Sequence, residues 1–262
     1  RNTIEVLNDH LFGGGAREKY PGIVLAFNGD FIAGNIHEEL TITNDKPVMP
    51  VVLSCFGNLI NLITAMADNY KRVMIFCTAG NHGRTTRRVP TKDKAWTSFD
   101  WLIYCLLEKW FINDPRVCFC ISNGEDVQFN VYNHRYRQTH GDQFRGGQGF
   151  VGPYAPITRG ELKKQTAATS YDLGYDTLIL GHFHTYMPMD DVMCNGSIVG
   201  FDEFSVRNNF RYRPPVQALW VTHPKYGITF RMPVFCDKRK ITQTSEWVSW
   251  KKEGPSPAEM FS

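Results

Sequence analysis

Four strand-like segments of this chain each end near a glycine that lies beside an Asp, Asn or His, and this pattern constrains the fold most. Three of these segments are short apolar runs, which are typical of strands buried on both faces of a sheet. In open α/β sheets, ligands bind just beyond the carboxyl ends of the strands. We therefore expect the four strand ends to converge on one site. The segments are Ile23–Phe27, Val73–Cys77, 127–139 and Thr177–Leu180, and their motifs are Gly29-Asp30, Gly80-Asn81-His82, His140-Gly141 and Gly181-His182-Phe183-His184.

The segments between these strands carry helical signals. Apolar periodicity and glycine stops predict helices over residues 2–13, 51–70, 95–112 and 159–173. Several shorter strands are expected over 192–236. The pattern predicts one α/β domain over residues 1–236, followed by a polar tail over 237–262.

Composition limits the partners and the compartment. The chain has 262 residues and a formal net charge of only +3, which by itself predicts neither a nucleic-acid nor a membrane partner. No stretch reaches the roughly 20 apolar residues of a membrane span, so we expect no membrane association. The seven cysteines are odd in number, and most lie in apolar strand-like runs. Free thiols in a reducing, cytoplasmic setting fit this usage better than a disulfide framework.

The residues at the four strand ends form a ligand set for hard metal ions. Asp30, Asn81, His140, His182 and His184 supply oxygen and imidazole ligands, and none supplies a thiolate. This set favours Mn²⁺, with Fe, Zn or Mg as alternatives. A carboxylate can bridge two ions roughly 3.5–4 Å apart, which is the arrangement that hydrolyses phosphoesters. Taken singly, each motif is also compatible with an ordinary turn.

The ordered series G-D, G-N-H, H-G, G-H-x-H resembles the calcineurin-like metallophosphoesterase family, which includes the DNA-repair nucleases of the SbcD and Mre11 type. The lead-in Gly174-Tyr175-Asp176-Thr177-Leu178-Ile179-Leu180 is similar to the family's own. The resemblance covers about residues 20 to 200. It implies an α/β/β/α fold, a two-sheet β-sandwich flanked by helices.

The resemblance also implies residue roles in a two-metal phosphoester hydrolase. Asp30 would bridge the two divalent metals, while Asn81, His140 and His182 would complete the shell of one. His184 would bind the other metal. His82 would lie above the phosphate, where it would stabilise the transition state or protonate the leaving group. A metal-bound hydroxide would attack phosphorus.

The sequence departs from the family pattern in two places. The family's first strand carries a D-x-H motif that this sequence lacks, since Asp9-His10 is adjacent rather than spaced and lies in a predicted helix. We expect the parent protein to continue upstream of Arg1 and to carry the motif there. Without it, the second metal would have only Asp30 and His184. Gly83 stands where the family usually has an acid that orients the catalytic His, and Asp142 or Asp202 could replace that acid.

Two basic patches bear on the substrate. Arg84, Arg87 and Arg88 follow His82 and could clamp phosphate oxygens, or could simply form a solvated loop. The segment 207–213 mixes Arg with aromatic residues, which suits a nucleic-acid strand as well as an ordinary hairpin. The glycine-rich segment 144–150 is either a lid or a plain loop.

These patches favour DNA as the partner and a phosphodiesterase or nuclease as the activity. The alternatives are a phosphatase or phosphodiesterase for small nucleotides or phosphoproteins, and a catalytically dead binding scaffold.

Overall fold

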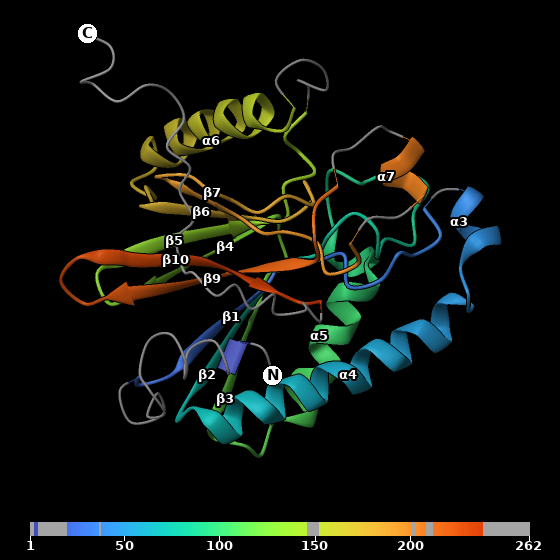
Figure 1. The fold of residues 1–262 in the computed structure, drawn as a ribbon, viewed down its shortest axis with the longest axis horizontal. Coiled ribbons are helices and arrows are strands. Elements are labelled where there is room, and N and C mark those ends of the chain that lie inside the picture. Colours follow the sequence, from blue (N-terminus) through green and yellow to red (C-terminus); the bar gives the residue numbers. More distant parts are fainter. Residues whose placement is uncertain are drawn as a thin grey trace, which may run out of the picture.

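A computed structural model describes residues 3–4, 20–36, 38–145, 152–200, 203–207 and 212–237. Within these residues the chain forms two central sheets with helices outside them (Figure 1). All of the predicted helix over 2–13 except residues 3–4, which are helical, lies outside the described residues. So do Asp9, His10 and Asp202, most of the segments 144–150 and 207–213, and all of the predicted tail except Asp237.

The first sheet has three parallel strands in the order β1-β2-β3. They are β1 (Ile23–Phe27), β2 (Val73–Cys77) and β3 (Val117–Ile121). In the register, Phe27 lies opposite Cys77 and Cys77 opposite Ile121, so the three strands end level with one another. The turns that follow β1 and β2 therefore start side by side.

Two helices cover one face of this sheet, α4 (Val48–Asn69) and α5 (Phe99–Trp110) (Figure 1). Ile63 of α4, Ile75 of β2 and Ile103 of α5 are fully buried in one core cluster. Among the described residues α4 is the one helix long and apolar enough to cross a membrane, a test that the core helix of a globular domain also passes. Our expectation that no stretch was that apolar was therefore too strict.

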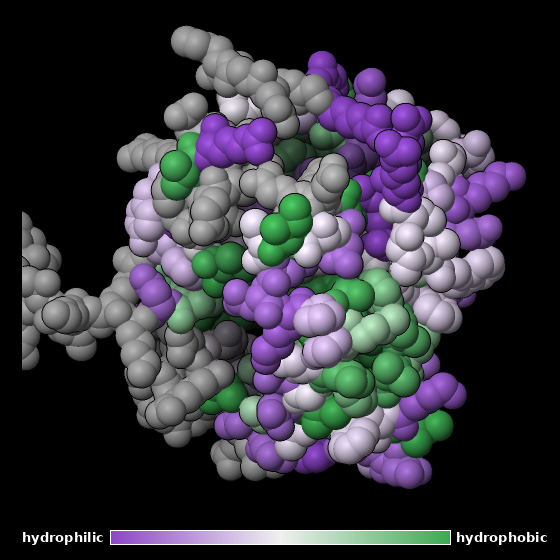
Figure 2. Space-filling model, turned by 90° about the vertical axis from the view of Figure 1, so that its right-hand side faces the viewer, coloured by the Kyte–Doolittle hydropathy of each residue, from purple (hydrophilic) through white to green (hydrophobic). Residues whose placement is uncertain are grey.

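The exposed side of α4 carries apolar side chains of its own. Met49 is 58% and Leu53 is 67% exposed. Figure 2 draws the side of the molecule that is on the right in Figure 1. Hydrophobic side chains gather in its lower half, at the height that α4 has in Figure 1. One side of α4 thus supports the sheet while the other remains an apolar surface.

The second sheet has five strands in the order β4-β5-β6-β8-β7. Strands β5, β6 and β8 run parallel, while β4 and β7 pair antiparallel at the edges. Helix α6 (Tyr154–Thr169) covers the outer face, where its Ile157 packs with Leu178 and Leu180. The strands are β4 (Asp126–Val131), β5 (His134–Thr139), β6 (Thr177–Leu180), β7 (Met187–Pro188) and β8 (Val192–Cys194).

Aromatic packing joins the two sheets face to face. The rings of Phe76 on β2 and Phe129 on β4 stack with their centroids 3.8 Å apart. Trp220 joins the same cluster from the antiparallel hairpin of β9 (Val216–His223) and β10 (Gly227–Phe235). The order is therefore helices, sheet, sheet, helix, which confirms the predicted α/β/β/α sandwich.

The strands predicted at Ile23–Phe27, Val73–Cys77 and Thr177–Leu180 have the predicted bounds. The single strand predicted over 127–139 is wrong, because β4 and β5 form a hairpin whose two-residue turn begins at Tyr132 with φ 55°. No glycine marks that turn.

Three other predicted segments also differ from the structure. The helix predicted over 95–112 is interrupted at Ser98, whose extended backbone separates a short 3-10 helix, η2 (Ala95–Thr97), from α5. Helix α6 starts at Tyr154 rather than at 159. The 192–236 region contains helix α7 (Glu203–Arg207) as well as strands, and β9 and β10 are long rather than short.

The contact between the sheets can be tested by removing one ring. Phe129→Ala leaves a cavity where Phe129 stacks on Phe76, so we expect the free energy of unfolding to fall by about 3–5 kcal/mol in urea denaturation. Ile112→Ala is the control, because Ile112 is 74% exposed and should change stability by about 0.5 kcal/mol or less. A loss below about 1 kcal/mol for Phe129→Ala would contradict this packing.

Candidate metal centre

The turns after β1 and β2 approach each other closely, and glycine makes this possible. A Cβ on Gly29, which has φ 78°, would collide with the backbone of Gly80. A Cβ on Gly80 would in turn collide with the carboxylate of Asp30. Because both residues are glycines, the two turns can lie close enough for Asp30 and Asn81 to meet.

The second sheet brings two histidines to that point. His140 follows β5 directly and is only 1% exposed. Its Nδ1 lies 2.6 Å from the carbonyl oxygen of Asn28, just beyond β1, so one ligand from the second sheet is anchored to the first. His182 follows β6 in the same way.

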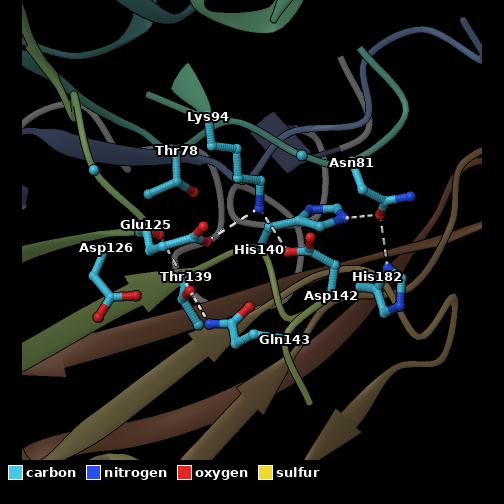
Figure 3. Close-up of polar contacts among 12 residues, drawn as sticks. Thr78, Asn81, Lys94, Glu125, Asp126, Thr139, His140, Asp142, Gln143 and His182 are labelled. Atoms are coloured by element: carbon cyan, nitrogen blue, oxygen red, sulfur yellow. Dashed lines mark hydrogen bonds and ion pairs between the residues drawn. The ribbon is translucent and has the colours of Figure 1, made fainter. Parts of the chain in front are cut away.

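These side chains form one cluster of ligand atoms. Nε2 of His140 lies 3.0 Å from Oδ2 of Asp30 and 3.0 Å from Oδ1 of Asn81. Nδ1 of His182 lies 3.0 Å from the same Asn81 oxygen (Figure 3). Asp30, His140 and His182 each offer an atom within 4.8 Å of the others. Ligands bound to one ion at about 2.1 Å are separated by comparable distances.

The cluster holds too few protons to satisfy its own lone pairs. The Asn28 carbonyl can only accept, so Nδ1 of His140 must donate to it. In neutral His140, Nε2 is then a lone pair that faces two further acceptor oxygens. Oδ2 of Asp30 is buried and makes no hydrogen bond of acceptable geometry, despite its short distance to His140. A proton on Nε2 or a metal cation resolves this arrangement, and a histidine that donates its other nitrogen to a carbonyl is typical of metal ligands.

The charges and burial of the cluster favour the metal-binding forms of Asp30 and His182. Burial alone would raise the pKa of Asp30, but His140 and His82 beside it hold that pKa well below its usual range. Burial works against protonation of His140, yet the Asp30 carboxylate outweighs it and raises the His140 pKa. Burial and the neighbouring His140 lower the pKa of His182 to about 4. At neutral pH, Asp30 is therefore a carboxylate and His182 a neutral imidazole, the forms that bind metals.

The backbone is strained where the ligands lie. Asp30, His182 and His184 have φ values of 55°, 58° and 50°, in the left-handed region that side chains with a Cβ rarely adopt. Asp93, Tyr132 and Asp172 have similar φ values elsewhere in the described chain, so these angles describe the ligand turns and do not by themselves mark a site. No cluster among the described residues adds His184 to Asp30, His140 and His182 within 4.8 Å, so the structure gathers four of the five predicted ligands.

A backbone carbonyl is the partner of the predicted catalytic His82. Its Nδ1 lies 2.9 Å from the carbonyl oxygen of Ala33, and its backbone N–H donates to Oδ1 of Asp30 at 2.7 Å. The carbonyl can only accept, so Nδ1 carries the proton. Asp142, one of the two carboxylates we expected to orient His82, instead binds Lys94 at 2.7 Å.

The arginines after His82 differ from one another. Arg84 directs its guanidinium at carbonyls of its own loop, including that of Asn81 at 2.6 Å. It therefore stabilises the turn that carries Asn81, and fewer of its N–H donors remain for a phosphate. Arg87 and Arg88 are exposed.

Sequence reasoning missed three buried polar residues around the centre. Lys94, only 5% exposed, lies between Asp142 and Glu125 (Figure 3). Gln138 donates from β5 to the carbonyl oxygens of Phe27 at 2.8 Å and Phe76 at 3.1 Å, which ties the ends of the two sheets together. The third is Asp100, which is fully buried near the start of α5. In the sequence, Asp100 is marked only by its position two residues after Ser98, the serine that caps α5.

No family model and no curated protein matches this sequence. Among solved structures it is similar to a novel archaeal phosphodiesterase, at 12% identity and TM-score 0.32 over 81% of this chain and 97% of that chain. It is also similar to a mutant of Vps29 from Entamoeba histolytica, at 12% identity and TM-score 0.33 over 80% and 97%. A third is a predicted phosphoesterase from Streptococcus pneumoniae, at 13% identity and TM-score 0.27 over 75% and 79%. Identities and TM-scores this low assign no activity to this chain.

Metal binding at this centre should depend on pH with a defined sign. A metal must displace the proton of His140, whose pKa is raised, so Mn²⁺ affinity should fall by up to about tenfold per pH unit as the pH falls below that pKa. His182, with its pKa of about 4, adds to the loss only near that pH. Isothermal titration calorimetry in buffers of different ionisation enthalpy would measure the proton release. An affinity that does not change as the pH falls would contradict the assignment of His140.

Proposed function

We propose that this protein hydrolyses phosphoesters with two divalent metal ions. Asp30, Asn81, His140 and His182 would hold one ion, and Asp30 and His184 would contribute to the second. The observation that carries the proposal is the convergence of buried lone-pair atoms at the strand ends, directly beside His82. Bound divalent ions, of which we favour Mn²⁺, supply Lewis acidity and a nucleophile at neutral pH.

His82 is suited to exchange a proton with the substrate. Because Nδ1–H is bound to the Ala33 carbonyl, protonation of the ring changes only Nε2. The backbone N–H of His82 donates to Asp30, so the imidazole is fixed at the edge of the metal centre. In its protonated form, His82 would give the Nε2 proton to the leaving oxygen, or would stabilise negative charge on the phosphoryl group.

The proposed substrate class is a nucleic-acid phosphodiester, with DNA as the first choice. Arg87 and Arg88 are exposed on the loop that follows His82, where guanidinium groups can contact phosphates on either side of the reacting one. Arg207, Tyr212 and Arg213 are the described residues of the second basic patch. All seven cysteines are free, which agrees with a reducing, intracellular setting for such a substrate.

A pair of histidine variants tests the activity. With Mn²⁺ present, His82→Ala should lower kcat by about 10²–10⁴-fold on an end-labelled DNA oligonucleotide, because the proton donor is lost while the ligands stay. The matched control is His223→Ala, since His223 is exposed on β9 and should leave kcat unchanged. Equal rates for both variants would contradict the role of His82.

The same assay separates the substrate classes. Binding of DNA should weaken steeply as salt rises, because neutralised phosphates release counterions. Hydrolysis of a small artificial phosphodiester without DNA cleavage would move the substrate to nucleotides or phosphoproteins. No hydrolysis of either substrate would leave a binding scaffold and contradict the proposed enzyme.

A further inference from the structure

The buried carboxylate of Asp100, which is not one of the proposed metal ligands, connects the turn that carries Asp30 to the turn that carries Asn81. Asp100 is 0% exposed and lies in the first turn of α5. Its Oδ2 accepts hydrogen bonds from the backbone N–H of Asp30 and of Gly80, both at 3.0 Å. Its Oδ1 accepts from the N–H of Phe31 at 3.2 Å. One side chain thus holds the turn after β1 and the turn after β2.

The described part of the chain places no cationic partner beside this carboxylate. Among the residues that the structure describes, no Lys, Arg or His forms an ion pair with Asp100. Burial and the nearby Asp30 raise the pKa of Asp100, and the three backbone donors act against that shift. The N-terminus of α5, which Ser98 caps, also favours the charged form. A buried carboxylate is costly unless it is well hydrogen-bonded, and here three backbone N–H groups supply those bonds. An apolar side chain would leave these donors without an acceptor.

The same carboxylate explains why residue 83 is a glycine. A Cβ on Gly83 would lie 3.0 Å from both Cγ and Oδ2 of Asp100, and 2.9 Å from Oγ of Ser98. The carbonyl of Gly83 also accepts from the N–H of Phe99 at 2.7 Å, which fixes this segment against the start of α5. The space of a side chain at position 83 is therefore filled by Asp100, which reaches it from another element.

We propose that Asp100 is a positioning residue that sets the distance between Asp30 and Asn81 in the metal centre, and that it occupies the place of a side chain on residue 83. The proposal deepens the proposed function and rests on it for the identity of the ligands. If this is correct, a carboxylate at residue 83 should be able to replace the one at residue 100 in positioning the two ligand turns. A side chain at residue 100 that only filled space could not be replaced in this way.

The test moves the carboxylate from residue 100 to residue 83. Asp100→Ala removes it, Gly83→Asp adds a second one that collides with the first, and the double variant leaves one carboxylate in the same space. We expect each single variant to weaken Mn²⁺ binding by about 10–100-fold in calorimetry, as loss of an outer-shell partner does. The double variant should recover to within about tenfold of the wild type. Glu108→Ala, an exposed acid on the same helix, is the control and should bind as the wild type.

A second readout does not depend on a metal. The amide N–H groups of Asp30, Phe31 and Gly80 should be protected from hydrogen exchange in the wild type, exposed in Asp100→Ala, and protected again in the double variant. Asp100→Asn keeps the shape but loses one acceptor, and it replaces Asp100→Ala if that variant does not fold.

The outcomes separate the two proposals. If the wild type binds no Mn²⁺ but amide protection follows the carboxylate, the proposed function fails and the positioning role stands. If Asp100→Ala binds Mn²⁺ as the wild type does, or if the double variant recovers neither binding nor protection, the positioning role is overturned.

Discussion

The geometry of this protein depends on one constraint: lone pairs from four strand ends meet in a buried place that has too few protons for them. Nδ1 of His140 is committed to the Asn28 carbonyl, so in neutral His140 the Nε2 faces oxygens of Asp30 and Asn81 as a lone pair. Acceptors without donors are unfavourable when buried, and a cation relieves that cost.

Contacts between the layers keep that arrangement in place. Gln138 reaches from the second sheet to the carbonyl ends of β1 and β2, and the stacked rings of Phe76 and Phe129 hold the sheets together behind it. Asp100 holds the two turns of the first sheet from the opposite side. The ligands themselves are thus carried on short turns, while their separation is set by packing across the sandwich.

Sequence reasoning succeeded where the signal was local. The apolar runs at Ile23–Phe27, Val73–Cys77 and Thr177–Leu180 are bounded by glycine or polar residues, and the strands have those bounds. The turn at Tyr132 has no glycine, so the hairpin was read as one strand. Asp100 lies 70 residues from Asp30 along the chain, and the carbonyl of Ala33 that orients His82 leaves no trace in side-chain chemistry. Partners of this kind become visible only when the fold is known.

The most direct test of the account is to locate a bound ion. Crystals of the protein soaked in Mn²⁺ would be measured near the manganese absorption edge, where anomalous scattering identifies the element. We expect an anomalous peak at roughly 2.0–2.2 Å from the ligand atoms of Asp30, Asn81, His140 and His182. The absence of a peak among these four side chains, or a peak confined to another part of the surface, would contradict it.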